Sequence, residues 1–508
     1  MARDATKNLV SPVVPMDPHM QPSDAFSWYM ERDPLLRSTV VAVGLLDRRP
    51  DADALRTLIE RASFVVPGMR HVVRTPPFRL ATPRWTVADE VDLNWHLRWA
   101  SVPAPGGFDQ VLAIARTKST SAFDPARPLW EFTFVDGLAA GRAAFILKFH
   151  HAITDGIGGM QLAMELFDLN RNGNGPRPAP AHPAAESLGT PQLALDALSY
   201  QVGRALGLAR ALPGVALRTT AQTMRDPFGT IAGVLRATRS VARTVAPYRN
   251  TLSPVMQDRH LGRALDVLEV PTKDLMRAGS AVGAHLNDAF VSAVTGGMRR
   301  YHESHGRTVD ELRVTMPISL RTASDGPGGN RLTLSRFAIP AGLPDAAERT
   351  QAIHRVIDGW RAEPSLGMTQ AIAVGLNMLP SAFIGGMLKH VDFLASNVPG
   401  FPVPVYLAGA RLLAYYPFGP TIGSSVNVTL LSYVDTCYVG INCDTGAIPD
   451  PDVFVECLRE GFAEVIAVGG GAGPVRLPLH DPAPVRRRPA GKAAGDLPRK
   501  ARAREPRA

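Results

Sequence analysis

The sequence has few cysteines, and none lies in a metal-binding pattern. All three, Cys437, Cys443 and Cys457, fall late in a chain of 508 residues. An odd number of cysteines with this spacing excludes the common zinc patterns and predicts reduced thiols in a cytoplasmic protein. The chain also begins without the apolar core of a secretory signal, which fits the same compartment. We therefore expect neither a disulfide nor a metal site.

Acidic residues are scarce relative to basic ones. The chain has 46 Asp and Glu against 55 Lys and Arg, a formal net charge of +9, which predicts acidic partners. Much of the excess lies in a tail after Leu479 and in residues 201–257, which contain eight arginines and a single acid, Asp226. Apolar residues separate these arginines. The stretch therefore fits either a membrane-surface helix or a packed linker helix with a solvated basic face.

Long uninterrupted apolar runs are also missing. Residues 366–388 carry no charge, but polar residues, glycines and Pro380 interrupt them. A membrane-spanning helix needs ~20 predominantly apolar residues. The stretch therefore favours amphipathic helices that line an apolar cavity or touch a bilayer surface.

The length and the order of the expected elements predict two domains of mixed α and β structure. A chain of 508 residues is too long for one compact core. Hydrophobic periodicity predicts strands at 39–46, 91–97 and 143–149, and crossover helices at 190–212 and 228–246. The expected segments are a flexible N-terminus at 1–22, a first half at 23–183, an arginine-rich helical crossover at 184–258, a second half at 259–468 and a basic disordered tail at 469–508.

One short stretch combines the groups needed for acid–base chemistry. The apolar run 143–148 predicts a strand that ends at His150 and His151, followed by a turn that holds Asp155 and Gly156. Side chains alternate along a strand, so one histidine can face a cavity while the other packs behind it. Gly156 permits the turn by tolerating positive φ. This arrangement can mount a general base on a rigid element.

The motif His150-His151-x-x-x-Asp155-Gly156 resembles the HHxxxDG signature of CoA-dependent acyltransferases and of peptide-synthetase condensation domains. Further blocks, in the right order, resemble those of the bacterial wax ester synthase/acyl-CoA:diacylglycerol acyltransferase (WS/DGAT) family. These blocks are Pro128-Leu129-Trp130, Asn287-Asp288, Pro317 to Arg321, Gly329-Asn330, Ser396 to Gly400 and Val426 to Val428. The resemblance covers residues 20–468.

The resemblance implies a fold and a reaction. The fold is mixed α/β (α+β), with two chloramphenicol-acetyltransferase-like subdomains and a tunnel between them. The reaction is O-acyl transfer from acyl-CoA, a co-substrate rather than a cofactor, to diacylglycerol, which yields triacylglycerol. Two alternatives stay open: a wax ester synthase that uses long-chain alcohols, and a catalytically weak acyl-CoA- or lipid-binding paralogue. We expect a cytoplasmic protein that associates peripherally with a membrane or lipid droplet, and no nucleic-acid partner.

The resemblance also assigns roles to the two histidines. His151, the second histidine, is the expected general base, which takes the proton of the attacking hydroxyl. His150 either supports the geometry or acts directly. Trp130 is expected in the core, although it belongs to a family block.

The remaining predicted site residues have supporting or electrostatic roles. Asp155 is expected to hold the shape of the site by pairing with Arg321, as a buried ion pair does, and Gly156 completes the turn. Asn287 is either a side-chain donor to the developing oxyanion or a helix cap. Asn427 is a weaker candidate, for which a turn or strand-end role suits equally well.

Overall fold

The computed structural model describes the chain from residue 17 to residue 471, with gaps. The described ranges are 17–153, 162–173, 175, 184–225, 233, 235–236, 238–242, 246, 248–319, 332–379 and 381–471. Three predicted site residues, Asp155, Gly156 and Arg321, lie outside them, as do most of the predicted N-terminal segment, nearly all of the tail and much of the predicted helix 228–246. His150 and His151 are described.

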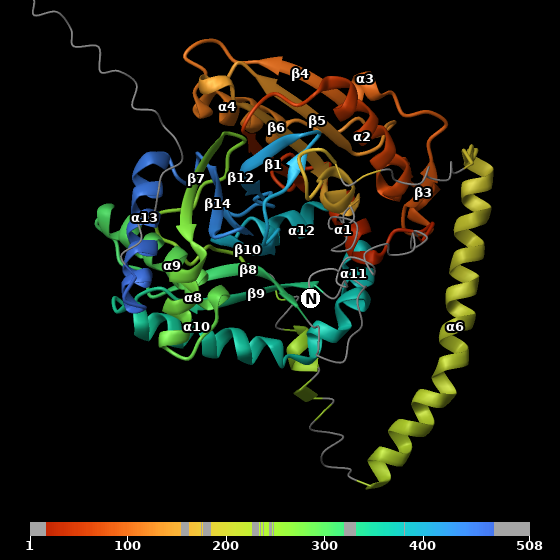
Figure 1. The fold of residues 1–508 in the computed structure, drawn as a ribbon. Helices are drawn as coiled ribbons and strands as arrows, with labels where there is room; N and C mark the ends of the chain where they lie inside the picture. The colour runs from red at the N-terminus through yellow and green to blue at the C-terminus, as the bar shows by residue number, and fades with distance from the viewer. Residues whose placement is uncertain are drawn as a thin grey trace, which may run out of the picture.

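Two six-stranded sheets form the body of the molecule, one in each half (Figure 1). The first sheet has the strand order β11-β12-β1-β6-β5-β4. Its strands are β1 (Thr39–Leu46), β4 (Leu97–Ser101), β5 (Trp130–Asp136), β6 (Ala143–His150), β11 (Tyr406–Leu407) and β12 (Ala410–Phe418). Strands β1 and β6 are mostly apolar and almost completely buried, because the sheet is covered on both faces.

The second sheet has the order β7-β14-β13-β10-β8-β9. Its strands are β7 (Arg263–Pro271), β8 (Glu311–Ser319), β9 (Leu332–Pro340), β10 (Phe393–Pro399), β13 (Val426–Tyr433) and β14 (Thr436–Asp444). Four helices share its apolar core: α8 (Thr272–Ala281), α9 (Leu286–Ser304), α10 (Ala346–Arg361) and α13 (Pro451–Val468). The mixed α and β architecture predicted from the sequence is confirmed.

The two halves exchange strands. β11 and β12 come from the second half of the chain but complete the sheet of the first half. Strand β12 pairs antiparallel with β1, with Val41 opposite Phe418, and Figure 1 shows the two strands side by side. The predicted segment boundaries do not express this exchange, because such a distant pairing leaves no local pattern in the sequence.

Smaller elements surround the first sheet. They are α2 (Ala52–Val65), η1 (Pro67–Met69), β2 (His71–Arg74), η2 (Pro77–Arg79), β3 (Arg84–Val87), α4 (Phe108–Thr120) and η3 (Ala139–Gly141). Helix α4 packs on β1 and β6 and also contacts β7 of the second half. It therefore lies at the junction between the halves.

The strand predicted at 91–97 is wrong over most of its length. Residues Leu93–His96 form the helix α3, and β4 begins only at Leu97. Asp92 explains the difference, because its carboxylate accepts hydrogen bonds from the N–H groups of Asn94 (2.9 Å) and Trp95 (3.2 Å). Such a cap starts a helical turn that alternating hydrophobicity does not reveal.

The crossover begins with a long helix, α6 (Thr190–Arg225), which continues past its predicted end at residue 212. Its first turns pack on the first half, where the Asp196 carboxylate pairs with Arg84 (2.6 Å) and His19 (3.1 Å). The helix then stands away from the body (Figure 1). Its outer face therefore has no partner among the described residues.

The uncharged stretch 366–388 forms short helices. They are η5 (Pro364–Met368), α11 (Thr369–Asn377) and α12 (Ser381–Leu388). Helix α11 packs against α1 (Pro22–Met30), where Asn377 Nδ2 donates to Pro22 O (2.9 Å). In the part of the chain that the structure describes, no helix is long and apolar enough to cross a membrane.

Candidate active site

The two histidines lie where the central strand β6 ends and the short helix η4 (His151–Ile153) begins. The neighbouring strands hold this junction from both sides. The His150 N–H donates to Leu129 O (3.0 Å), and the His151 N–H donates to Ser38 O (2.9 Å). Leu129 immediately precedes β5 and Ser38 immediately precedes β1. The sheet itself therefore fixes the backbone of both histidines.

Close packing against η4 fixes the loop further. A Cβ on Gly68 would lie 2.9 Å from Ile153 O, so glycine is required at this approach. Next to it, Trp130 is buried, stacks on His96, and donates from Nε1 to Met69 O (2.9 Å). Trp130 therefore lies in the core, as predicted, and holds the segment against which η4 packs.

His150 faces the protein interior. Its side chain is fully buried, and its ring meets Trp28 edge-on at 5.8 Å between centroids. Nδ1 accepts a hydrogen bond from Ala152 N–H (3.0 Å), so the proton of the neutral ring is on Nε2. Nε2 lies 3.1 Å from Glu31 Oε1, within ion-pair distance but outside hydrogen-bond alignment. These contacts favour a supporting role for His150.

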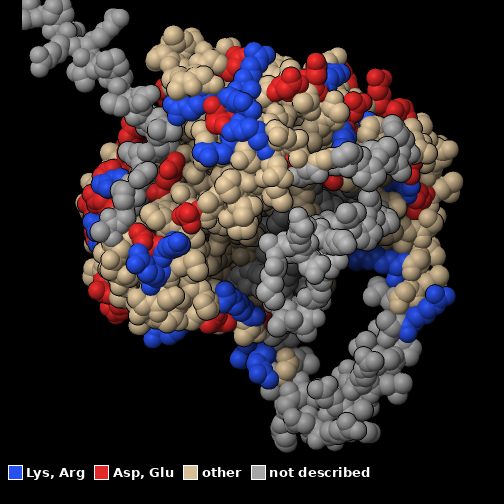
Figure 2. All heavy atoms as spheres, viewed as in Figure 1, with Lys and Arg blue, Asp and Glu red and all other residues tan. Residues whose placement is uncertain are grey.

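His151 is placed differently. Its side chain is accessible to solvent, yet protein surrounds it. This burial, together with the nearby His150, lowers the pKa of His151. Surface that is both accessible and enclosed by protein is typical of a side chain in a hollow, and Figure 2 shows that the molecule is hollowed between its halves. The lowered pKa keeps the imidazole neutral near pH 7, and a neutral imidazole can accept a proton.

Asn287 lies in the first turn of α9, in the second half. The cap of this helix is made by Asp288, whose Oδ2 accepts a hydrogen bond from His285 N–H (2.9 Å) and lies 2.7 Å from His354 Nδ1. Asn287 is half-buried, and no hydrogen bond to His150 or His151 is found for it among the described residues. Its role as an oxyanion donor stays a prediction.

Asn427 shapes a turn. Its buried side chain donates from Nδ2 to Pro420 O (2.7 Å) and accepts from Thr429 Oγ1 (2.7 Å). Both hydrogen-bonding ends are therefore occupied within the second half. Ser396 and Asn397, which begin one of the family blocks, lie half-buried in β10.

A pocket of about 260 Å³, lined by both polar and apolar residues, lies between the halves. Thr39, opposite His150 in the β1–β6 pair, belongs to its first-half wall with Arg37, and Asn442 belongs to its second-half wall. Thr39 and Asn442 are only 3% and 4% exposed. Nevertheless Arg37 Nε, Thr39 Oγ1 and Asn442 Oδ1 have no hydrogen-bond partner among the described residues. Because unpaired buried polar atoms cost free energy, the pocket is suited to a polar ligand.

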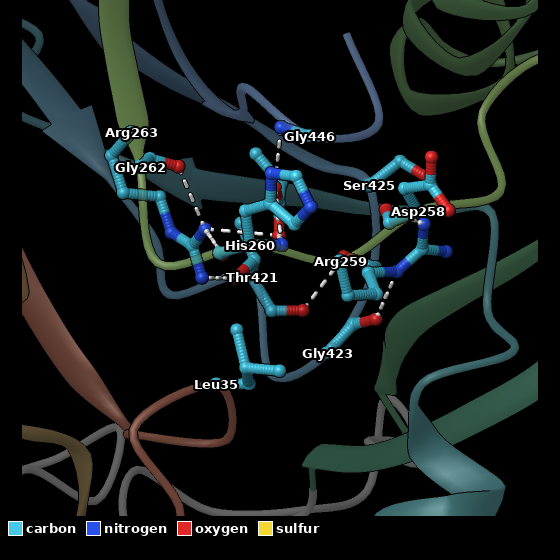
Figure 3. A network of polar contacts seen from close by, with 12 residues as sticks. Leu35, Asp258, Arg259, His260, Gly262, Arg263, Thr421, Gly423, Ser425 and Gly446 are labelled. Atoms are coloured by element: carbon cyan, nitrogen blue, oxygen red, sulfur yellow. Dashed lines mark hydrogen bonds and ion pairs between the residues drawn. The ribbon is translucent and has the colours of Figure 1, made fainter.

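A buried network holds the second-half wall of this pocket (Figure 3). The Asp444 carboxylate accepts hydrogen bonds from His260 N–H (2.9 Å) and Gly446 N–H (2.9 Å) and pairs with Arg263 (3.0 Å). Arg263 also donates to Thr421 Oγ1 (3.2 Å). The pocket therefore has a fixed cationic group on each side, Arg263 and Arg37, and no acidic residue among the described residues that line it.

Sequence reasoning missed Glu31, Ser38, Thr39 and Asn442. Their proximity to His150 or to the pocket depends on tertiary pairing, for which the sequence offers no local signal. Among the residues that the structure describes, no group of three or more His, Cys, Asp or Glu is placed to hold a metal ion. The three cysteines are free thiols.

Solved structures with this fold define the class of protein. The wax ester synthase/diacylglycerol acyltransferase from Marinobacter aquaeolei VT8 superposes with a TM-score of 0.57 at 19% identity, over 89% of this chain and 100% of its own. The first condensation domain of the calcium-dependent antibiotic synthetase gives 0.55 at 15% identity, over 90% and 97%. The chain therefore has the chloramphenicol-acetyltransferase-like fold of these proteins, as predicted.

Comparison of the sequence identifies the family within that class. The wax ester synthase/diacylglycerol acyltransferase catalytic domain matches residues 20–290, and the WS/DGAT C-terminal domain matches residues 328–465. The chain is 35% identical over 452 residues to a Mycobacterium tuberculosis protein named "Putative diacyglycerol O-acyltransferase Rv2484c". The alignment covers 88% of this chain and 91% of that protein. A second protein of that organism, Rv1760, is 27% identical over 79% of this chain and 81% of its own. The chain belongs to the WS/DGAT family and is an acyltransferase.

Proposed function

We propose that the protein transfers a long-chain acyl group from acyl-CoA to diacylglycerol, forming triacylglycerol, with His151 as the general base. The observation that carries this proposal is the contrast at the histidine junction. His150 is fully buried, with Nδ1 hydrogen-bonded and Nε2 3.1 Å from the Glu31 carboxylate, whereas the side chain of His151 is accessible and has a lowered pKa. The relatives named as diacylglycerol acyltransferases favour diacylglycerol as the acceptor.

The proposed reaction needs one proton acceptor and no acyl-enzyme. Neutral His151 takes the proton of the acceptor hydroxyl while the oxygen attacks the thioester carbonyl. The new C–O ester bond forms, the C–S bond breaks, and the CoA thiolate leaves and recovers the proton from the imidazolium. A positioned base of this kind contributes ~10²–10⁴-fold to the rate. Asn287 is the proposed donor to the developing oxyanion.

The pocket between the halves supports CoA as the acyl carrier. Diacylglycerol and fatty alcohols are neutral and mostly apolar, whereas CoA carries phosphates and amide groups. A pocket with Arg37 and Arg263, free hydrogen-bonding atoms on Thr39 and Asn442, and no acidic lining residue suits the CoA portion. A structural neighbour, the starter condensation domain of rhizomide synthetase, was solved in complex with C8-CoA.

The outer face of α6 supports docking on a lipid surface. Leu195, Leu198, Val202 and Leu206 are 68%, 59%, 50% and 51% exposed, and their spacing of three or four residues places them on one face of the helix. The lipid substrates require access to a membrane or droplet, and the formal charge of +9 favours an anionic one. We therefore propose peripheral association through α6.

A wax ester synthase is the second candidate function, because the matching family model covers both activities. The deciding experiment presents purified protein with palmitoyl-CoA and either dipalmitoylglycerol or hexadecanol, and measures free thiol and the lipid product. We expect faster CoA release and triacylglycerol with the diacylglycerol, and a loss of ~10²–10⁴-fold in the His151→Ala variant. Preference for hexadecanol would make the protein a wax ester synthase. Release with neither acceptor would favour the binding-protein alternative, and wild-type turnover of His151→Ala would reject the base.

A further inference from the structure

We propose that Glu31 is a positioning residue that holds His151 in place through His150 and Ser38. The proposal rests on the assignment of His151 as the base. Glu31 immediately follows helix α1, and its side chain is 15% exposed. It belongs to none of the family blocks recognised in the sequence.

The first connection runs from Glu31 to the backbone of His151. Glu31 Oε1 accepts a hydrogen bond from Ser38 N–H (3.2 Å). The carbonyl of the same residue, Ser38, accepts from His151 N–H (2.9 Å). Ser38 is 1% exposed, so its N–H depends on Glu31 for a partner, with no access to bulk water. The carboxylate therefore fixes the residue to which the base is bonded.

The second connection runs through the imidazole of His150. Its Nδ1 accepts from Ala152 N–H (3.0 Å), which puts the ring proton on Nε2, and Nε2 lies 3.1 Å from the same oxygen, Oε1 of Glu31. The N–H is not aligned with this oxygen as in a hydrogen bond, but a negative charge this close to the protonated nitrogen is attractive, and more so in a buried site. Ala152 directly follows His151. The contacts thus close a ring, the Glu31 ring, made of Glu31, Ser38, His151, Ala152 and His150.

The Glu31 ring joins the base to both halves of the molecule. Glu31 caps the C-terminal end of α1, and α1 packs against η4 on one side and against α11 of the second half on the other. Arg37 lies 3.8 Å from Glu31 Oε2 and donates to Thr120 O (2.7 Å), which partly balances the carboxylate. A shift of α1 would therefore be transmitted through Glu31 to both sides of His151.

The Glu31 ring predicts a specific kinetic defect. Glu31→Ala removes the shared acceptor, so His151 loses its fixed position, whereas Arg37 in the wall of the proposed CoA pocket keeps its hydrogen bond to Thr120 O. We expect kcat to fall ~10–100-fold, the usual cost of a misplaced catalytic group, with the KM for palmitoyl-CoA within about twofold of wild type. Glu31→Gln keeps an acceptor oxygen of the same reach and is expected to recover most of kcat.

Asp47→Ala is the matched control. Asp47 is a partly buried carboxylate just beyond the other end of β1; it accepts from Arg411 N–H (2.8 Å) and pairs with Arg171 (2.6 Å), far along the strand from the histidines. This variant should leave kcat at the wild-type value. Wild-type kcat in Glu31→Ala, a defect confined to KM, or Glu31→Gln as impaired as Glu31→Ala would overturn the proposal.

A second measurement separates this proposal from the proposed function. Histidine-selective ¹⁵N labelling reports the tautomer of each imidazole in the wild-type protein and in Glu31→Ala. The wild-type spectrum should show His150 protonated on Nε2. In the variant, the signals of both His150 and His151 should shift. A folding probe that reports on the buried Trp130 should stay unchanged. Unshifted signals would reject the Glu31 ring. Absence of acyl transfer in the wild-type protein would instead reject the proposed function.

Discussion

Two largely buried carboxylates, one in each half, differ in how completely they are paired. Asp392, directly before β10, accepts three backbone hydrogen bonds, from the N–H groups of Leu252 (3.3 Å), Ser253 (3.0 Å) and Arg313 (2.7 Å). Glu31 accepts one backbone hydrogen bond and faces an imidazole that lacks an aligned partner. The fully paired carboxylate, Asp392, fixes the chain, whereas the incompletely paired one, Glu31, contacts His150, the neighbour of the proposed base His151.

The surroundings of the two carboxylates extend this difference. Around Asp392, the segment that enters the second half is also held by Ser253 Oγ, 2.7 Å from His302 Nε2. Around Glu31, polar atoms of Arg37, Thr39 and His150 lack hydrogen-bond partners among the described residues. Native proteins leave few buried polar groups unpaired. These unpaired atoms gather around Glu31 and the residues next to it.

The largest effect that we expect from this comparison of Asp392 and Glu31 is a loss of stability when Asp392 is replaced. Asp392→Ala leaves the buried N–H groups of Ser253 and Arg313 without an acceptor, at about 1–3 kcal/mol each, so we expect a loss of about 2–5 kcal/mol in the free energy of unfolding. Urea denaturation measures it. Asp392→Asn keeps one acceptor oxygen and serves as the control, with a smaller loss. A loss below about 1 kcal/mol would show that Asp392 is not a structural anchor.

The dependence of activity on pH tests the surroundings of the histidines, next to Glu31. The proposed mechanism requires neutral His151, so kcat/KM is expected to fall as the pH falls through the pKa of His151. Burial and the neighbouring His150 lower that pKa, so we expect the acid limb to have its midpoint below about 6.5, the ordinary histidine value. Asp392→Asn should leave the midpoint in place. A midpoint at or above the ordinary value would contradict the described environment of His151.

The smallest expected effect concerns the surface, away from both carboxylates. Replacing Leu198 and Val202 on α6 with serine removes apolar area that would insert into a lipid surface, and we expect liposome binding to fall about 5–10-fold. Co-sedimentation with vesicles containing anionic lipid measures it. Met276 and Val453, similarly exposed on second-half helices, replaced with serine provide the control. Equal liposome binding by all variants would show that α6 only connects the two halves and does not dock on lipid.

Local patterns in the sequence predicted most elements but not their long-range partners. The strand at 39–46 matches β1, because a run of β-branched residues is a local property. The strand at 91–97 failed because a single capping carboxylate, Asp92, outweighed the alternation. The pairing of β12 with β1, which could be seen only in the fold, has no local signal.

For the site, too, the sequence predicted the local motif but not the long-range contacts. The motif gave His150 and His151, but the division between a buried and an accessible ring depends on tertiary packing. Glu31 could not be found from spacing, because its link to His150 is made by the β1–β6 pair and by the position of α1. The pairing of Asp155 with Arg321 falls outside the described residues and stays a prediction.

The donated strand β12 has a consequence for any attempt to split the molecule. A fragment that ends before residue 406 would leave β1 as an open sheet edge with unpaired N–H and C=O groups, a template for aggregation. Strand β1, which follows Ser38 at the histidine junction, would then lose its outer neighbour. We therefore expect that neither half folds completely on its own. Reconstitution from separately expressed pieces would require β12 of the second piece to pair with β1 of the first.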